Sequence, residues 1–130
     1  MTDRELVAHA AAMRERAVAP YSHYHVGAAL LGRNGKVYGG CNIESAAYPA
    51  TLCAERAALA CAVADGCTDF EKLAVIASGE ALCTPCGICR QLLYEFAPDM
   101  AVLCCRGDQS WEELSMRELL PYGFGGHSME

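Results

Sequence analysis

The sequence predicts an α/β fold of three layers (α/β/α), in which helices cover both faces of a mixed, mostly five-stranded sheet. Three observations support this prediction. Segments with helical spacing alternate with short apolar runs, a turn signal joins two such runs early in the chain, and the later runs contain no charged residue. Alternating strands and helices favour parallel pairing, whereas two strands joined by a tight turn pair antiparallel. The sheet is therefore expected to contain both kinds of strand pair.

The first element is expected to be a helix. Thr2 and Glu5 match a capping box, and apolar side chains follow at helical spacing as far as Ala17. Proline cannot continue a helix, so Pro20 marks the latest position at which this one ends.

A β-hairpin is expected next. Residues 26–31 form a run of small and aliphatic residues, the Arg33-Asn34-Gly35-Lys36 segment is a turn signal, and residues 36–41 are expected to return as the second strand. Residues 42–52 show no clear period, which predicts a loop of functional length.

Helices and buried strands then alternate to the end of the chain. An alanine- and leucine-rich helix is expected to stop at Asp65-Gly66, and the next helix is expected to stop at Pro98. Ser115 and Glu118 form the capping pattern of a short last helix. The expected helices of this half span residues 53–64 and 86–96, and the short last helix runs from Ser115 into Pro121. The expected strands span residues 73–78 and 100–105, with an edge strand at 111–114.

Composition limits the possible functions. The 130 residues are 53% hydrophobic and 20% charged, which predicts a single globular domain spanning residues 1–130. The net charge is −6 with no run of Lys and Arg, which disfavours nucleic acid as a partner. We expect no membrane span and no secretory signal, and therefore a cytoplasmic protein.

The nine cysteines are expected to be reduced thiols, some of which bind metal. Cys61, Cys104 and Cys105 are expected to be small buried hydrophobic residues.

Three other cysteines predict a metal site. Cys53 begins one expected helix, and Cys86 and Cys89 lie three residues apart at the start of another, so that their side chains share one helix face. A helix N-terminus stabilises thiolates, and thiolate ligands favour zinc over magnesium or calcium. Three ligands leave a fourth position open, as in catalytic zinc sites. We therefore expect one Zn²⁺ ion per subunit.

Other interpretations of these thiols remain open. The segment from Cys83 to Cys89 resembles part of an iron–sulfur motif, but Leu93 stands where the next cysteine is expected. A closed structural zinc site would use Cys41 or Cys83 as its fourth ligand. A redox Cys-x-x-Cys pair would leave Cys53 without a role.

Glu55 favours the catalytic interpretation. It lies two residues after Cys53 on the first turn of an apolar helix, where burial of a carboxylate is costly without a partner or a function. Beside an open metal position, Glu55 can take a proton from water and pass it to a substrate. Arg56 is expected either to hydrogen-bond the thiolates and offset their charge or to be an ordinary surface cation.

These motifs resemble the zinc-dependent cytidine deaminases of the short, homotetrameric type. Cys53-Ala54-Glu55 and Pro85-Cys86-Gly87-Ile88-Cys89 match the three-cysteine form of the zinc deaminase signature. The resemblance covers nearly the whole chain. Further matching segments are Ala19-Pro20-Tyr21-Ser22, Val26-Gly27-Ala28-Ala29-Leu30, Gly40-Cys41-Asn42-Ile43-Glu44, Ala46-Ala47-Tyr48, Cys89-Arg90-Gln91 and Glu118-Leu119-Leu120-Pro121.

The resemblance implies a nucleoside site shared between subunits. Asn42 and Glu44 would bind the ribose hydroxyls, and their spacing at a strand exit independently suits a diol. Ala46 and Tyr48 would reach a neighbouring subunit's site, and Tyr24 and Phe124 would frame the pyrimidine ring. Tyr24 stands where members of the family often have Phe, and Phe124 lies in a short glycine-rich tail.

The implied reaction is hydrolysis of cytidine and 2′-deoxycytidine to uridine and 2′-deoxyuridine with release of ammonia, as in pyrimidine salvage. Water attacks C4 while Glu55 moves protons to N3 and to the leaving amine. Three alternatives remain open: deamination of an analogue such as blasticidin S, a non-catalytic zinc-binding module, and editing of RNA or DNA.

Overall fold

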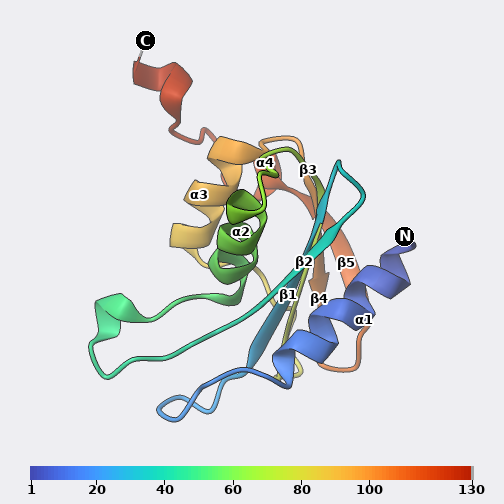
Figure 1. Cartoon of the computed structure of the whole chain (residues 1–130), viewed down its shortest axis with the longest axis vertical. Helices are drawn as coiled ribbons and strands as arrows, with labels where there is room; N and C mark the ends of the chain where they lie inside the picture. Colours follow the sequence, from blue (N-terminus) through green and yellow to red (C-terminus); the bar gives the residue numbers. More distant parts are fainter. Residues whose placement is uncertain (130) are drawn as a thin grey trace.

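A single mixed sheet forms the centre of the computed structural model, which describes residues 1–129 (Figure 1). The strand order is β2-β1-β3-β4-β5. Only β3 and β4 pair in parallel, and the other neighbours are antiparallel. The predicted mixed sheet of five strands is thereby confirmed. The strands are β1 (Val26–Gly32), β2 (Val37–Cys41), β3 (Phe70–Ala77), β4 (Ala101–Cys105) and β5 (Trp111–Ser115).

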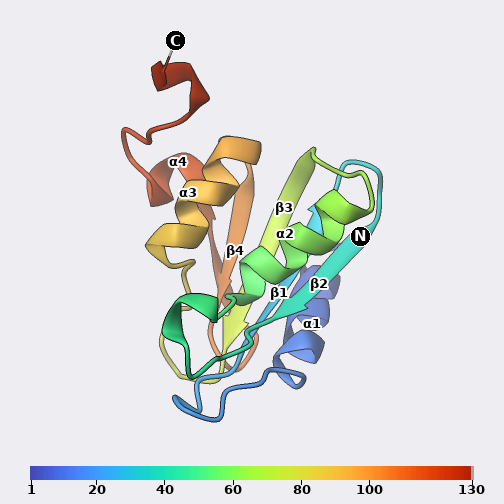
Figure 2. The same cartoon turned by 60° about the vertical axis from the view of Figure 1, so that its left-hand side comes forward.

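Helices cover both faces of this sheet, as Figures 1 and 2 show. α1 (Asp3–Arg14) lies on one face, and α2 (Ala54–Ala64) and α3 (Gly87–Phe96) lie on the other, with the short α4 (Met116–Leu119) packed against α3. Two 3₁₀ turns complete the elements, η1 (Tyr48–Ala50) and η2 (Gly126–Met129). In residues 1–129, no helix has the length and apolar character that a bilayer span requires.

The alternation of side chains along β1 builds two cores. Ala28 and Leu30 belong to the core under α2 and α3, whereas Ala29 and Leu31 belong to the core under α1. Successive strand residues point to opposite faces, so one aliphatic run serves both layers. Burial of a leucine side chain such as Leu30 contributes about 1.5–3 kcal/mol.

The first helix is shorter than predicted. It ends at Arg14, not at Ala17. The backbone of Val18 donates to the Asn42 carbonyl and accepts from the Glu44 N–H, which places Val18 beside Ile43 in a β-bridge. An extended residue at this position is incompatible with a longer helix, so tertiary pairing overrides the helical spacing.

The cysteine predictions had mixed outcomes. All nine cysteines are free thiols, and Cys104 and Cys105 are buried as expected. The prediction that Cys61 is buried is wrong, because it lies exposed on α2. The second half of α2 is therefore less buried than its apolar composition suggests: Ala60, Val63 and Ala64 are exposed as well.

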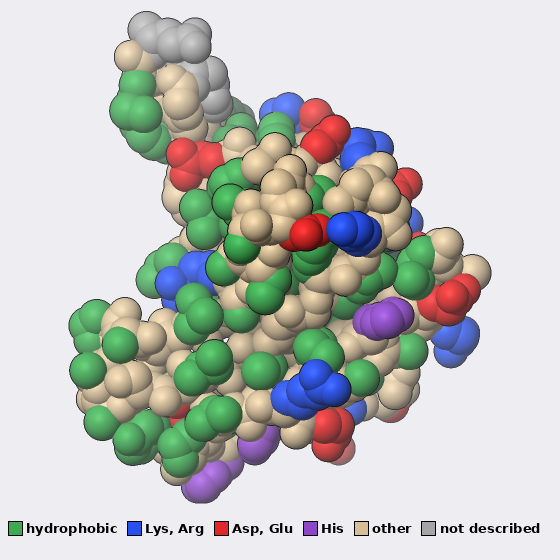
Figure 3. All heavy atoms as spheres, in the orientation of Figure 1, with side chains coloured by type: hydrophobic (Ala, Val, Ile, Leu, Met, Phe, Trp, Pro, Cys, Tyr) green, Lys and Arg blue, Asp and Glu red, His purple; other side chains and the backbone are tan. Residues whose placement is uncertain are grey.

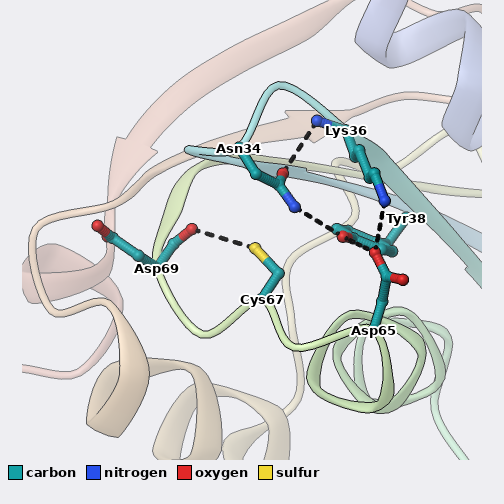
Figure 4. Close-up of polar contacts among 6 residues, drawn as sticks. All are labelled: Asn34, Lys36, Tyr38, Asp65, Cys67 and Asp69. Carbon is teal, nitrogen blue, oxygen red and sulfur yellow. Dashed lines mark hydrogen bonds and ion pairs between the residues drawn. The ribbon is translucent and has the colours of Figure 1, made fainter.

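A polar cluster ties the C-terminal end of α2 to the β1–β2 turn (Figure 4). Asp65, which caps α2, accepts hydrogen bonds through Oδ2 from the Tyr38 hydroxyl at 2.6 Å and from Lys36 Nζ at 3.1 Å. Asn34 Nδ2 donates to the same tyrosine oxygen at 2.9 Å. These bonds fix one end of α2, and the helix's other end carries Cys53 and Glu55.

Close packing fixes the first turn of α2 against β2. A Cβ atom at Gly40 would lie 2.3 Å from the Ala54 carbonyl oxygen and 2.5 Å from the Ala58 nitrogen, both of them backbone atoms of α2. Only glycine allows this approach.

We predict that Gly40→Ala lowers the free energy of unfolding by about 1–3 kcal/mol, because the added methyl group must displace helix backbone. Urea denaturation followed by circular dichroism measures the change. Gly39→Ala is the matched control, since the three atoms nearest to its Cβ would all belong to the flexible Met13 side chain. An equal or larger loss in the control would contradict the packing argument.

Candidate active site

Three thiols lie together at the first turns of α2 and α3. Cys53 is the N-cap of α2, Cys86 is the N-cap of α3, and Cys89 is within the first turn of α3. The Cys86 Sγ lies 3.7 Å from the Cys53 Sγ and 3.6 Å from the Cys89 Sγ. Tetrahedral coordination at a Zn–S distance of about 2.3 Å separates the sulfurs by about 3.8 Å. The spacing of the thiols therefore fits a zinc ion.

The group has three members in the part of the chain that the structure describes, and its ligand atoms lie within 4.8 Å of one another. Cys41 and Cys83, the two candidates for a fourth ligand of a closed site, do not belong to it. The Cys41 thiol instead faces the Arg16 carbonyl at 3.5 Å. This geometry favours an open site with three protein ligands.

Contacts within this group change the ionisation of Cys53 and Cys89. Hydrogen bonding from the Cys89 thiol lowers the pKa of Cys53 to about 5, and hydrogen bonding from Arg56 adds to this effect against the opposing effect of burial. The same contact with Cys53, together with burial, raises the pKa of Cys89. Of these two thiols, Cys53 is thus the first to ionise and to offer a thiolate to a metal.

Arg56 lies against this group. Its Nη2 donates to the Thr51 carbonyl at 3.2 Å and to the Cys53 Sγ at 3.5 Å. Contact with Cys53 is also the main cause of the raised Arg56 pKa. Arg56 Nε is buried without a hydrogen-bond partner within residues 1–129. This position supports the interpretation in which Arg56 hydrogen-bonds the thiolates and offsets their charge, and not the interpretation of Arg56 as an ordinary surface cation.

Glu55 lies on the first turn of α2 and is only 4% exposed. Burial raises the pKa of its carboxyl group to about 7, opposed by a hydrogen bond from its own backbone N–H. A carboxyl group with a pKa near neutrality can both accept and release a proton under ordinary conditions.

A pocket of about 190 Å³ opens over these groups. A larger hollow of about 600 Å³ lies beside Arg14 and Arg106, but none of the three thiols lines it. Of the two, the smaller pocket is the better candidate because Glu55 and two of the thiols, Cys53 and Cys86, line it. Its lining residues are Tyr24, Val26, Asn42, Glu44, Thr51, Leu52, Cys53, Ala54, Glu55, Cys83, Thr84 and Cys86.

Asn42 lies in the pocket wall and also braces the neighbouring backbone. Its Oδ1 accepts from the Val26 N–H at 2.9 Å, and its Nδ2 donates to the Tyr24 carbonyl at 2.8 Å. An amide group offers two donors and two acceptor sites, so one of each remains for a ligand.

Glu44 lies beside Asn42 in the pocket wall, and hydrogen bonds from the segment that precedes β1 hold its carboxylate. Its Oε1 accepts from the N–H groups of Tyr21 at 3.0 Å and Ser22 at 3.1 Å, and its Oε2 accepts from the Ser22 hydroxyl. These bonds lower the pKa of Glu44, and the bond from the Ser22 hydroxyl has the largest effect. The pocket therefore carries an ionised carboxylate on the side of Asn42.

Three of the residues predicted to bind the substrate lie outside this pocket. Ala46 and Tyr48 belong to the 42–52 loop, which extends away from the sheet (Figures 1 and 2), and Tyr48 is 79% exposed. Phe124 is 57% exposed in the C-terminal tail, where Gln91 donates to its carbonyl at 2.7 Å. Within one chain, the structure does not bring these side chains to the thiols.

Cys83 is a pocket residue that the sequence did not indicate as such. It is buried in the wall with Tyr24 and Glu55 nearby, and burial raises the pKa of its thiol to about 12. A neutral thiol at this position contributes shape to the pocket and no charge. No sequence signal separates such a residue from an ordinary core cysteine.

Comparison with known proteins agrees with this geometry. Residues 1–105 match the model of the cytidine and deoxycytidylate deaminase zinc-binding region. The cytidine deaminase of Sporosarcina psychrophila is 45% identical over 125 residues, which are 95% of this chain and 92% of that protein. That of Halalkalibacterium halodurans is 42% identical over 129 residues, which are 98% of each protein.

Solved structures give the same result for the fold. The crystal structure of cytidine deaminase from Burkholderia pseudomallei superposes with a TM-score of 0.91 at 41% identity, and the match covers 95% of this chain and all of that one. The zinc cofactor expected from the sequence agrees with the zinc-binding region of the family and with the spacing of the thiols. The chain therefore belongs to the cytidine and deoxycytidylate deaminase zinc-binding family.

Proposed function

We propose that residues 1–130 form one domain that hydrolyses cytidine and 2′-deoxycytidine to uridine and 2′-deoxyuridine with release of ammonia. The single observation that carries this proposal is the burial of the Glu55 carboxyl group beside three thiols with zinc-site spacing. A module that only bound zinc would have no need for a buried acid at this position, where an apolar side chain would be more stable.

Cys53, Cys86 and Cys89 would hold the zinc ion. When bound, zinc supplies a Lewis acid that makes water nucleophilic near neutral pH. Glu55 takes a proton from the attacking water and delivers it to N3 of the ring, and then moves a proton to the amine that leaves C4. Arg56 offsets the negative charge of the thiolates through its hydrogen bond to the Cys53 Sγ.

Asn42 and Glu44 select the sugar in this proposal. Both line the pocket, and each keeps hydrogen-bonding capacity for a ribose hydroxyl after its bonds to the protein are counted. This pairing favours a ribose-bearing substrate over blasticidin S. Tyr24 in the same wall would lie against the pyrimidine ring.

We further propose a homotetramer with shared sites. The 42–52 loop carries exposed apolar side chains, among them Ile43 and Tyr48, and Figure 3 shows hydrophobic side chains gathered at the corresponding corner of the molecule. Ligand pockets usually hold about 300–1,000 Å³, and the single-chain pocket holds about 190 Å³. Ala46 and Tyr48 from one copy and Phe124 from another would complete a pocket that one chain leaves partly formed.

The cytoplasm is the proposed compartment, because nine free thiols suit a reducing environment. Nucleic acid is not a proposed substrate, since the net charge of −6 provides no attraction for phosphates.

The test is a comparison of substrates. Purified protein with one equivalent of zinc is incubated with cytidine, 2′-deoxycytidine and a single-stranded oligonucleotide that contains cytosine. We expect one ammonia for each uridine or deoxyuridine formed, with at least a hundredfold lower kcat/KM on the oligonucleotide. Comparable turnover of the oligonucleotide would contradict the proposal.

A further inference from the structure

Ser22 contacts two residues of the pocket wall but does not itself line the pocket. Ser22 lies in the segment that connects α1 to β1, at the lower edge of the sheet in Figure 1. Its hydroxyl donates to Glu44 Oε2 and accepts from the Tyr24 N–H at 3.0 Å. One hydroxyl thus joins two residues of the pocket wall.

The direction of the hydroxyl hydrogen follows from these two bonds. Because the Ser22 oxygen accepts from the Tyr24 N–H, its own proton is free to point at the Glu44 carboxylate. A hydrogen bond to a charged group is stronger than one between neutral groups. Ser22 therefore restricts the rotation of the Glu44 carboxylate.

The protein already uses most of the hydrogen-bonding capacity of the Glu44 carboxylate. A carboxylate accepts about four hydrogen bonds. The Tyr21 and Ser22 N–H groups bond to Oε1, and the Ser22 hydroxyl bonds to Oε2. The remaining capacity lies on Oε2, so a ligand hydroxyl and the Ser22 hydroxyl must share this oxygen.

The local backbone supports a fixed arrangement. His23, between Ser22 and Tyr24, has a φ of 58°, in the left-handed region that non-glycine residues rarely adopt. Its N–H donates to the Ala19 carbonyl at 3.1 Å. Such a conformation persists where the surrounding bonds hold it.

We propose that Ser22 is a positioning residue, which aims Glu44 Oε2 at a sugar hydroxyl of the substrate. This inference rests on the proposed function, because it assigns the ligand of Glu44 as a ribose hydroxyl. Ser22 makes no contact with the substrate, and its effect passes through Glu44.

The first experiment compares Ser22→Ala with Ser22→Thr, which keeps the hydroxyl. With zinc-loaded proteins and cytidine, we expect Ser22→Ala to raise KM about tenfold with kcat within threefold, and Ser22→Thr to stay within threefold of the wild type in both. Ser110→Ala is the matched control. It also removes an exposed hydroxyl that donates to a carboxylate, Asp108, but lies away from the pocket.

The second experiment repeats these measurements with 2′,3′-dideoxycytidine, which lacks the 2′ and 3′ hydroxyls of the ribose. If Ser22 acts through Glu44 on the sugar, Ser22→Ala changes KM for this nucleoside by less than threefold. An unchanged KM for cytidine, or an equal rise for both nucleosides, would overturn the inference. The second result would mean that the substitution disturbs the pocket in general.

Binding without turnover separates this inference from the proposed function. Calorimetric titration of cytidine into zinc-loaded Glu55→Gln protein, with and without Ser22→Ala, should show a tenfold weaker Kd in the double variant. Equal Kd values would overturn the inference even if the wild type is an active deaminase. Failure of the wild type to release ammonia, together with absence of cytidine binding, would instead overturn the proposed function.

Discussion

Glu55→Gln is expected to lower kcat for cytidine by about a thousandfold or more while the protein retains its zinc. Glutamine has nearly the same shape as glutamate but cannot carry a proton. General acid–base catalysis contributes about 10²–10⁴-fold, and the proposal assigns more than one proton transfer to this residue. Because a buried carboxylate is costly, the variant should melt at the same temperature as the wild type or higher. Initial rates, metal content and thermal melting on the same preparation measure all three effects.

Glu15→Gln is the matched control, since it makes the same change on an exposed carboxylate at the end of α1. Its rate should equal that of the wild type. Full activity in Glu55→Gln would remove the catalytic role of Glu55 and favour a module that only binds zinc.

Cys86→Ala is expected to abolish stoichiometric zinc binding and to reduce turnover by at least a thousandfold. Two thiolates remain, and a zinc site needs at least three protein ligands to compete for the ion. The variant should also lose the stability that zinc binding provides to the native state. Mass spectrometry of metal content and melting with and without a chelator measure these effects.

Two control variants sharpen this test. Cys61→Ala removes an exposed thiol from α2 and should change neither zinc content nor turnover. Cys83→Ala should keep its zinc, because Cys83 lies outside the three-thiol group. Loss of zinc in Cys83→Ala would favour the closed structural site, and iron with acid-labile sulfide in the wild type would favour a cluster.

Much of the fold could be predicted because local signals agreed with the tertiary structure. The capping boxes at Thr2 and Ser115 both form. The Asn34-Gly35 turn sets the hairpin, and the apolar runs become buried strands. The start of β3 was missed, since it begins at Phe70, and charged Glu71 and Lys72 concealed its first residues.

The errors arose where distant contacts decide the structure. Helical spacing continued past Arg14, but pairing of Val18 with Ile43 ended the helix. The composition of α2 suggested a largely buried helix, yet a helix on the outer layer of one chain leaves its far side exposed, Cys61 included.

The candidate site also has a part that could be predicted from local sequence and a part that depends on distant contacts. The signature residues lie on the first turns of two helices, so their convergence followed from local sequence. The contacts of Ser22 with Glu44 and Tyr24 depend on how a loop folds onto a strand exit, which no periodicity encodes. The places of Ala46, Tyr48 and Phe124 depend on other copies of the chain in our proposal.

A zinc titration tests the central claim most directly. Metal-free protein is prepared with a chelator, zinc is added in fractions of one equivalent, and conversion of cytidine to uridine is measured at each step. The account predicts no turnover without zinc and a linear rise that stops at one zinc ion per chain. Turnover in metal-free protein, or a chain that binds one zinc ion and leaves cytidine unchanged, would contradict it.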